Sequence, residues 1–466
     1  MIKSISSKSM NIKKTVALTV YLMLCNYLIA QVNIFSSNKE YQWKTETLEW
    51  SNTKKQIEAD IIVNEENTYQ TIDGWGGCFN ERGWKALQYL TGEKQKEIMT
   101  KLFSDNGCAF SYCRMPIGAS DYALDYYSLN DTHGDYKMNH FSIDRDRKYL
   151  FPYIKAAIQI NPELKVWGSP WTPPAWMKEN NSYNKGLIKM DPQILEAYAL
   201  YFQKYVEAYR NEGVNIVAVH PQNEPLHLPA FPSCGWSGQN LKTFIKDYLG
   251  PRFKKHVPNC EIWLGTINGN KETDEFSEYI QPIFGDPEVA KYITGAGFQW
   301  DGDSAVERTN KEFPNKKIMQ TETKCGWGTN DWKYAFETYN QMVWYLERNA
   351  SYYLQWNMVL NETGMSSWGW KQNTMITVDT FNKTYQINPQ YWAVRHFTQF
   401  VKPQAKRVSC KTKDGIQSLA FKNPNGNIVL ILSNQSNKEQ NVTIQVKKKC
   451  VNLKLLSGTI YSALIK

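Results

Sequence analysis

The fold is indicated most directly by two short segments, VAVHPQNEP at residues 217–225 and KIMQTE at residues 317–322. In each, a short apolar run typical of a buried strand leads to a glutamate, Glu224 in the first and Glu322 in the second. In a barrel of parallel strands, the residues at the ends of the strands point into the mouth where catalysis takes place. Two carboxyl groups that face one cleft are the basic equipment for hydrolysing a glycosidic bond.

The stretch around these glutamates alternates between strand-like and helix-like patterns. Residues 165–169 predict a strand, residues 196–212 an amphipathic helix, and residues 214–219 the next strand. Such alternation is typical of βα units around a parallel sheet. We therefore predict an α/β fold, a (β/α)8 TIM barrel over residues 71–392. The glycines of GWGG at residues 74–77 lack the spacing of a phosphate loop and indicate close backbone packing.

The two ends of the chain have a different, β-rich character. Residues 416–421 and 428–432, with Asn425 and Gly426 as the turn between them, predict a hairpin. Near the other end, residues 57–63 alternate as in a half-buried strand. We predict a side β-sandwich that both chain ends form, from residues 31–70 and 393–466, packed tightly on the barrel.

The first thirty residues predict a signal peptide. Lys13 and Lys14 precede an apolar run from residue 16 to residue 30, which is short for a membrane span. Cleavage near Ala30 would leave an exported protein, periplasmic, cell-surface or extracellular, with no stable membrane insertion. The alternative is an uncleaved anchor on a protein that works at a lipid surface.

Charge and cysteine content exclude several classes of function. The net charge of +9 falls to +5 (9 − 4) without the four lysines before residue 31, which is too mild for a nucleic-acid-binding protein. The remaining cysteines show no CxxC pair and no zinc-type histidine spacing, so we expect no metal and no cofactor. Disulfides and buried free thiols are both open for these eight residues: Cys78, Cys108, Cys113, Cys234, Cys260, Cys325, Cys410 and Cys450.

The residue types beside the two glutamates fit the two halves of such a reaction. Glu224 suits a general acid if burial and a second carboxylate raise its pKa, and Asn223 beside it could bind a sugar hydroxyl. Glu322 suits a nucleophile, which has to be ionised. The structural alternatives are a loop-capping role for Glu224 and a buried ion pair between Glu322 and Lys324.

Aromatic and charged residues on other strand ends extend this candidate site. Trp171, in the rigid segment WGSPWTPPAWMK at residues 167–178, could stack on the apolar face of a sugar, although core packing is the alternative. Asp121 could accept hydrogen bonds from sugar hydroxyls, and Arg114 could brace the nucleophile. An Arg114–Asp121 ion pair that only holds the loop is the rival interpretation.

The order of these motifs resembles glycoside hydrolase family 30, the glucosylceramidase-like enzymes of the clan A retaining β-glycosidases. The resemblance runs from about residue 57 to residue 460 and includes GWGG, the segment 114–121, SPWTPPAWM at 169–177, QNEP at 222–225 and TE at 321–322. It implies a retaining mechanism without cofactor or metal, in which Glu224 is the acid/base and Glu322 the nucleophile. It also implies that the sugar-binding positions are Asp121, Trp171, Asn223 and Trp356.

One segment departs from the family pattern. Many members carry His-Trp-Tyr after the sixth strand, with the Tyr on the nucleophile, whereas this chain has FQWDGD at residues 298–303. Trp300 keeps the aromatic position and Asp301 takes the place of the Tyr. If Asp301 faces the site, it would alter the nucleophile's pKa or bind a different hydroxyl. The alternative is that Asp301 turns away into the loop.

Together these patterns predict a secreted retaining β-glycosidase. Its substrates are expected to be β-glucosides, either β-1,6-glucan and gentiobiose or a glycolipid of the glucosylceramide type. β-Fucosides and β-xylosides are alternatives within the family. A protein of another class, a non-catalytic carbohydrate-binding protein on the same scaffold, would keep the tryptophans without turnover. Retention predicts carboxyl groups about 5 to 5.5 Å apart.

Overall fold

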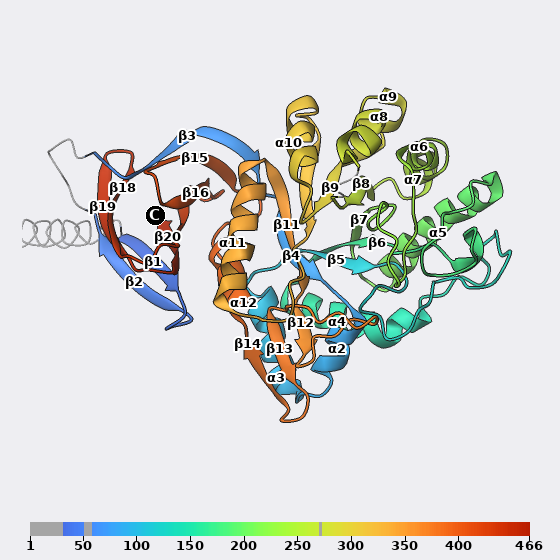
Figure 1. Ribbon diagram of the computed structural model, residues 1–466, viewed down its shortest axis with the longest axis horizontal. Coiled ribbons are helices and arrows are strands. Elements are labelled where there is room, and N and C mark those ends of the chain that lie inside the picture. The colour runs from blue at the N-terminus through green and yellow to red at the C-terminus, as the bar shows by residue number, and fades with distance from the viewer. Residues whose placement is uncertain (1–30, 51–57, 270–272) are drawn as a thin grey trace, which may run out of the picture.

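The computed structural model describes residues 31–50, 58–269 and 273–466, and it shows a strand-rich part beside a larger part of strands and helices (Figure 1). The predicted signal peptide lies outside the described residues, as does Ile57. Eight parallel strands close into a barrel in the order β10-β11-β4-β5-β6-β7-β8-β9, which confirms the predicted TIM barrel. The barrel strands are β4 (Gly74–Cys78), β5 (Tyr112–Pro116), β6 (Lys165–Ser169), β7 (Ile216–Val219), β8 (Glu261–Ile267), β9 (Ile293–Gln299), β10 (Lys317–Glu322) and β11 (Ala350–Asn357).

Helices lie outside the barrel strands and in the connections between them (Figure 1). The α-helices are α2 (Glu81–Leu87), α3 (Gly92–Phe103), α4 (Asp144–Ile160), α5 (Pro192–Asn211), α6 (Gly238–Thr243), α7 (Gly250–His256), α8 (Gln281–Phe284), α9 (Pro287–Ala290), α10 (Asp303–Glu312), α11 (Trp332–Glu347) and α12 (Pro389–Thr398). Shorter helical segments of other types are η1 (Ala175–Met177), η2 (Phe244–Leu249) and η3 (Phe276–Ile280). A small sheet consists of β12 (Val359–Asn361), β13 (Ile376–Asp379) and β14 (Thr384–Ile387).

Local sequence explains two details of the barrel. A Cβ atom on Gly76 would lie 1.8 Å from the carbonyl oxygen of Tyr112, so only glycine lets β4 approach β5 this closely. Helix α5 begins before the predicted residue 196, because the Asp191 side chain caps the amides of Gln193 and Ile194. The spacing of the apolar residues, from which the helix was predicted, does not indicate this cap.

The β-sandwich contains strands from both ends of the chain, as predicted. Its nine strands follow the order β19-β18-β3-β15-β16-β17-β20-β1-β2, and in Figure 1 the blue strands lie among the red ones. Val32 and Ile34 of β1 share one buried cluster with Leu430 of β17 and Ile444 of β18. The strands are β1 (Gln31–Ser37), β2 (Lys44–Glu49), β3 (Ile61–Thr71), β15 (Lys406–Thr412), β16 (Gln417–Lys422), β17 (Ile428–Asn434), β18 (Gln440–Val446), β19 (Lys449–Leu455) and β20 (Thr459–Ile465).

Helix α12 joins the sandwich to the barrel, and the predicted boundary at residue 392 falls inside it. His396 of this helix is fully buried, and its Nδ1 lies 2.6 Å from Ser462 Oγ while its Nε2 lies 3.0 Å from Ser37 Oγ. Burial lowers the pKa of His396 to about 3, so the ring is neutral at physiological pH. The ring of Phe35 packs 4.4 Å from that of Phe400, which adds an apolar contact to the same junction.

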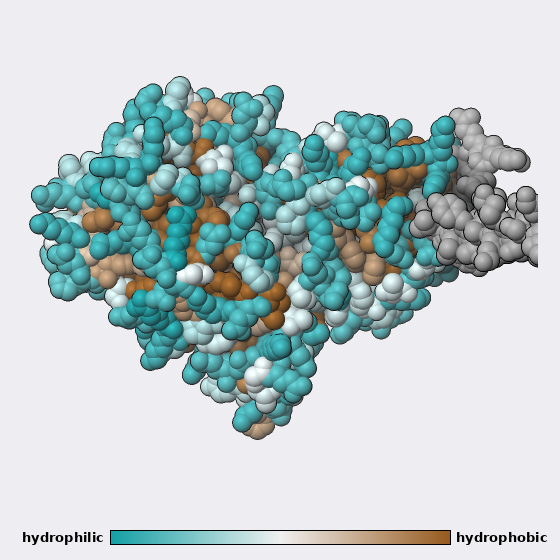
Figure 2. Space-filling model, turned by 180° about the vertical axis from the view of Figure 1, so that it is seen from behind, coloured by the Kyte–Doolittle hydropathy of each residue, from teal (hydrophilic) through white to brown (hydrophobic). Residues whose placement is uncertain are grey.

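The structure answers the question of the thiols for the residues that it describes, whereas the apolar run at residues 16–30 lies outside them. Among the described residues, no disulfide links the eight cysteines, and most of them are buried thiols. Among the same residues, no helix has the length and apolar character needed to cross a bilayer. Seen from behind, hydrophilic residues cover most of the surface, and apolar ones show between them over both parts (Figure 2).

Candidate active site

Glu224 and Glu322 line one pocket at the mouth of the barrel. Glu224 follows β7, the fourth barrel strand, and Glu322 ends β10, the seventh. The pocket has a volume of about 350 Å³. Its wall consists of Asp121, Trp171, Asn223, Glu224, His227, Phe231, Asn268, Gly269, Trp300, Asp301, Glu322, Cys325, Trp368, Trp370 and Gln372.

Two donors from other strands hold the Glu322 carboxylate. Arg114 Nη1 donates to Glu322 Oε2 at 2.6 Å, and Gln299 Nε2 donates to the same oxygen at 3.0 Å. Both residues of the ion pair are buried, and the arginine side chain is fully inaccessible. Lys324 is not the partner of Glu322, because its Nζ lies over the ring of Trp300 at 5.9 Å from the centroid. The buried cation favours the ionised form of Glu322.

Arg114 is itself fixed from several sides. Its Nη2 donates to Asn223 Oδ1 at 2.6 Å and to Ser169 Oγ at 2.9 Å. The guanidinium also lies 4.5 Å from the centroid of the Trp171 ring, within range of a cation–π interaction. Arg114 therefore braces Glu322, and the rival pairing with Asp121 is not the one that the structure contains.

The contacts of Asn223 orient its amide. The Oδ1 atom accepts hydrogen bonds from Arg114 Nη2 at 2.6 Å, from Thr266 Oγ1 at 2.9 Å and from Gln299 Nε2 at 3.0 Å. With the oxygen engaged by three donors, the NH2 group is the part of the amide left for a ligand in the pocket. Asn223 can thus donate to a hydroxyl beside the reacting centre.

The backbone of Glu224 is held in an unusual conformation. Its φ is 49°, in the left-handed region that non-glycine residues adopt at a cost of about 1–3 kcal/mol. Two hydrogen bonds hold this conformation, from Glu224 N to the Thr266 carbonyl at 3.0 Å and from His227 N to the Glu224 carbonyl at 2.9 Å. Backbone strain of this kind is concentrated at functional sites, where it aims a side chain.

The two carboxyl groups have different electrostatic surroundings. Burial raises the pKa of Glu224 well above its ordinary value, and the charges of Glu322 and Asp121 raise it further. Burial also raises the pKa of Glu322, but the nearby Arg114 guanidinium opposes that increase. The surroundings of the pair therefore favour the proton on Glu224 and the charge on Glu322.

The other predicted residues fall into two groups. Asp121, Trp171, Trp300 and Asp301 all line the pocket. Asp301 faces it although its Oδ1 also accepts a hydrogen bond from Gly269 N at 2.6 Å. Trp356 is not among the lining residues, but its ring stacks on that of Trp171 at a centroid distance of 5.5 Å, and both tryptophans are 2% exposed. Its contact with the sugar stays a prediction.

The sequence did not predict the residues whose hydrogen bonds link the catalytic side chains to one another. Gln299 contacts both Glu322 and Asn223, and Thr266 contacts Asn223, although they lie on different strands. Gln372 Oε1 accepts a hydrogen bond from Trp356 Nε1 at 2.8 Å and so fixes the orientation of the Trp356 ring. Gln299 ends a barrel strand, and that position is the signal that could have identified it.

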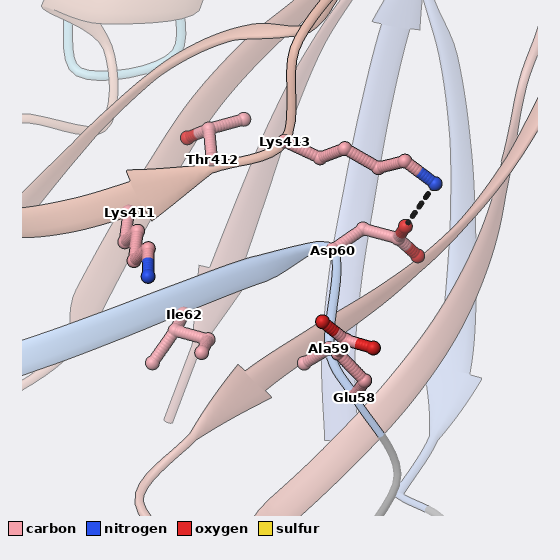
Figure 3. A pocket seen from close by; sticks show the side chains of 7 residues that line it. All are labelled: Glu58, Ala59, Asp60, Ile62, Lys411, Thr412 and Lys413. Carbon is pink, nitrogen blue, oxygen red and sulfur yellow. Dashed lines mark ion pairs between the residues drawn. The ribbon is translucent and has the colours of Figure 1, made fainter.

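Another hollow, of about 380 Å³, lies on the β-sandwich at β3 and β15 (Figure 3). Its charged groups do not converge. Lys413 is drawn toward Asp60, with the two charged groups 3.4 Å apart, while Lys411 and Ile62 lie apart from them. Among the residues described here, no cluster of three or more His, Cys, Asp or Glu side chains could hold a metal ion. The pocket at the barrel mouth differs from this hollow because four carboxyl groups line it together: Asp121, Glu224, Asp301 and Glu322.

Comparison with known proteins agrees with this geometry. Residues 72–401 match the glycosyl hydrolase family 30 TIM-barrel domain, and residues 404–462 match the beta sandwich domain of the same family. Lysosomal acid glucosylceramidase of Mus musculus is 24% identical over 409 residues, 82% of this chain and 79% of that protein. Endo-1,6-beta-D-glucanase neg1 of Aspergillus fumigatus is 26% identical over 411 residues, 81% of each chain.

A solved structure extends the match to the fold of nearly the whole chain. The endo-beta1,6-glucanase BT3312 superposes with a TM-score of 0.85 at 26% identity, and the match covers 93% of this chain and 98% of that one. Both family domains are matched in the order in which they occur here. The chain belongs to glycosyl hydrolase family 30 and is a glycoside hydrolase.

Proposed function

We propose that this protein is an exported, retaining β-glycosidase that hydrolyses β-glucosides. The observation that carries the proposal is the pairing of Glu322, held ionised by Arg114 at 2.6 Å, with Glu224, whose pKa is raised, in one pocket. The nucleophile has to be ionised and the general acid has to be protonated at the same pH. These surroundings favour the ionised form of Glu322 and the protonated form of Glu224.

In the proposed reaction, Glu322 attacks the anomeric carbon while Glu224 gives its proton to the leaving oxygen. This step forms a covalent bond between Glu322 and the sugar and breaks the glycosidic bond. Glu224, now ionised, takes a proton from water as that water attacks the same carbon. The bond to Glu322 breaks, the sugar leaves with the β configuration, and both glutamates return to their starting states.

The relatives support glucosyl substrates. Their names include glucosylceramidase and endo-1,6-beta-D-glucanase, and these are the two substrate types expected from the sequence. Export is proposed from the apolar run that ends at Ala30, and the mature protein recovered outside the cytoplasm should begin at Gln31. N-terminal sequencing of the cell fractions would expose an uncleaved anchor instead.

Hydrolysis of aryl β-glycosides by residues 31–466 tests the reaction. We expect turnover of the β-glucoside, above that of the fucoside, xyloside and galactoside. Nuclear magnetic resonance during the first minutes should show the β anomer before mutarotation, because two inversions restore the configuration. An initial α anomer would contradict the double displacement. Preference for the fucoside or xyloside would reassign the sugar and leave the mechanism intact.

Asp121→Asn is expected to weaken catalysis while it stabilises the fold. Asp121 is 5% exposed, and burial, followed by the charge of Glu322, raises its pKa to about 8. The loss of a buried recognition group should reduce kcat/KM about 10- to 100-fold. An unfolded Asp has a pKa near 3.9. From about pH 4 to pH 8, Asp121 therefore ionises in the unfolded chain but stays protonated in the folded protein, which lowers the free energy of unfolding of the parent increasingly with pH.

The asparagine variant lacks this ionisation. Its advantage in the free energy of unfolding should therefore grow with pH across that window and be smallest near pH 4. Urea denaturation at a series of pH values measures the difference. An advantage that does not change with pH would show that Asp121 is not kept neutral in the folded protein.

A further inference from the structure

Three tryptophans lie together at the edge of the catalytic pocket, and we call them the tryptophan rim: Trp327, Trp368 and Trp370. Trp327 lies on the loop after β10, and the other two lie on the loop between β12 and β13. The ring centroid of Trp370 is 5.5 Å from that of Trp327 and 5.7 Å from that of Trp368. Trp327 is 77% exposed and Trp368 42% exposed, which is unusual for the largest apolar side chain.

The rim continues the wall of the pocket on the side of the acid. Trp368 and Trp370 both line the pocket. The ring of Trp368 lies 5.4 Å from that of Phe231, on the loop that carries Glu224. Since Glu224 protonates the leaving oxygen in the proposed reaction, groups next to its loop border the leaving group. The rim therefore flanks the departing half of the substrate.

The backbone beneath Trp327 is shaped to present this side chain. Gly326 has φ +63° and Gly328 has φ +73°, both in the left-handed region. A Cβ atom on Gly326 would lie 2.8 Å from Asn373 Cγ, and one on Gly328 would lie 2.5 Å from Lys371 Cγ. Glycine is thus required on both sides of an indole that projects into solvent.

The loop of Trp368 and Trp370 is tied to the pocket. Trp370 N donates to Ser366 Oγ at 3.0 Å and closes a tight turn. Ser367 N donates to the carbonyl oxygen of Asp121 at 2.7 Å, which links the turn to a residue of the pocket wall. The backbone that carries these two rings is therefore held in place before a ligand arrives, which lowers the entropy cost of binding.

The chemistry of the rim suits a hydroxylated ring. Indole faces stack on the C–H faces of a pyranose. The pocket wall that the rim continues also carries polar side chains, among them Asp121, Asn268 and Gln372, which can form hydrogen bonds with hydroxyl groups. An acyl chain would offer these groups no hydrogen-bond partner, which costs free energy. These features favour a saccharide over a lipid on this side of the pocket.

We propose that the tryptophan rim is a saccharide-binding subsite for the leaving group, and that the substrates are β-linked oligosaccharides and not glycosides of a lipid. This inference rests on the proposed function and narrows it. Each further sugar that reaches the rim adds stacking, so catalytic efficiency should rise with chain length. A small aryl leaving group bound in the pocket should not reach Trp327, which is not part of the pocket wall, and should gain nothing from it.

Trp327→Ala and Trp327→Phe test the proposal on an aryl β-glucoside and on β-1,6-linked glucose oligomers of two to four sugars. Trp327→Ala should lose about tenfold in kcat/KM on the longest oligomer and less than about twofold on the aryl glucoside, because Trp327 is not among the residues that line the catalytic pocket. Trp327→Phe should recover most of the loss. Phe381→Ala is the matched control, because Phe381 is 90% exposed on the far β13–β14 turn.

The outcomes separate this proposal from the proposed function. Suppose that the parent hydrolyses the aryl glucoside. If the variants then lose kcat/KM equally on all substrates, or lose none on any, the saccharide-binding role of the rim is wrong, while the proposed function stands. A parent without any turnover would overturn the proposed function. In that case, quenching of tryptophan fluorescence by the tetrasaccharide, weaker in Trp327→Ala, still supports the subsite, and its absence refutes it. Binding to phosphatidylcholine–phosphatidylserine vesicles that falls in Trp327→Ala, with chain-length dependence unchanged, would assign the rim to lipid instead.

Discussion

Glu322→Gln is expected to abolish turnover of every glycoside, with kcat at least about 10⁴-fold lower, because no covalent intermediate can form. Glu224→Gln should lose about 10²- to 10⁴-fold on substrates with poor leaving groups and far less on aryl glycosides, which need no proton. In the parent, activity should fall at high pH as Glu224 loses its proton, and this alkaline limb should be absent in Glu224→Gln.

The contrast between the two variants assigns the roles. Azide should accelerate Glu224→Ala on an activated aryl glycoside, because it attacks the glycosyl-enzyme without general-base help, and the product should be a β-glycosyl azide. Glu261→Gln serves as the control, since Glu261 lies at the start of β8, the opposite end of the barrel. If azide instead rescued Glu322→Ala, the assigned roles would be reversed. Full activity of Glu322→Gln would restore the hypothesis of a binding protein.

Arg114→Met is expected to lower the free energy of unfolding by about 3–5 kcal/mol and to suppress activity. It leaves Glu322 buried without its cation, and an uncompensated buried charge is strongly destabilising. The variant also removes the donors to Asn223 and Ser169. Urea denaturation measures the loss of stability. Arg147→Met is the comparison, because Arg147 pairs with Asp144 and Glu212, whose side chains are 79% and 37% exposed.

A double variant distinguishes charge from packing. In Arg114→Met with Glu322→Gln, the unpaired charge is gone, so much of the lost stability should return. A double-variant loss that equals the sum of the two single losses would show that Arg114 stabilises the fold through packing alone. Arg114→Lys should stay impaired in activity, since an ammonium group cannot reproduce the planar set of contacts to three residues.

The sequence predicted the barrel and the facing glutamates because each depends on a local signal. A short apolar run before Glu224 or Glu322 marks a strand end, and parallel strands bring their ends to one mouth. The hairpin around Gly426 was predictable for a similar reason, since its φ of +86° favours glycine. The strand ends and the hairpin could be predicted because each depends on a few neighbouring residues.

Other features depend on contacts between distant segments. Nothing next to Gln299 in the sequence indicates that it bridges Glu322 and Asn223. The stacking of Trp356 on Trp171 was likewise not evident, because the two rings come from segments far apart in the sequence. The left-handed backbone of Glu224 was also not evident, because it depends on the Thr266 carbonyl of the next strand.

The pairing of β1 with β20 imposes an order on biosynthesis. Val32 lies opposite Ile465, a separation of 433 positions (465 − 32), and among the described residues β20 is the strand that joins the β1–β2 hairpin to the rest of the sheet. β1 therefore cannot pair with the sheet until β20 has been synthesised, and the whole barrel is synthesised between them. Until then, the edge of β1 that pairs with β20 lacks its native partner. An unpaired strand edge of this kind can pair with other chains and so favours aggregation of the nascent protein.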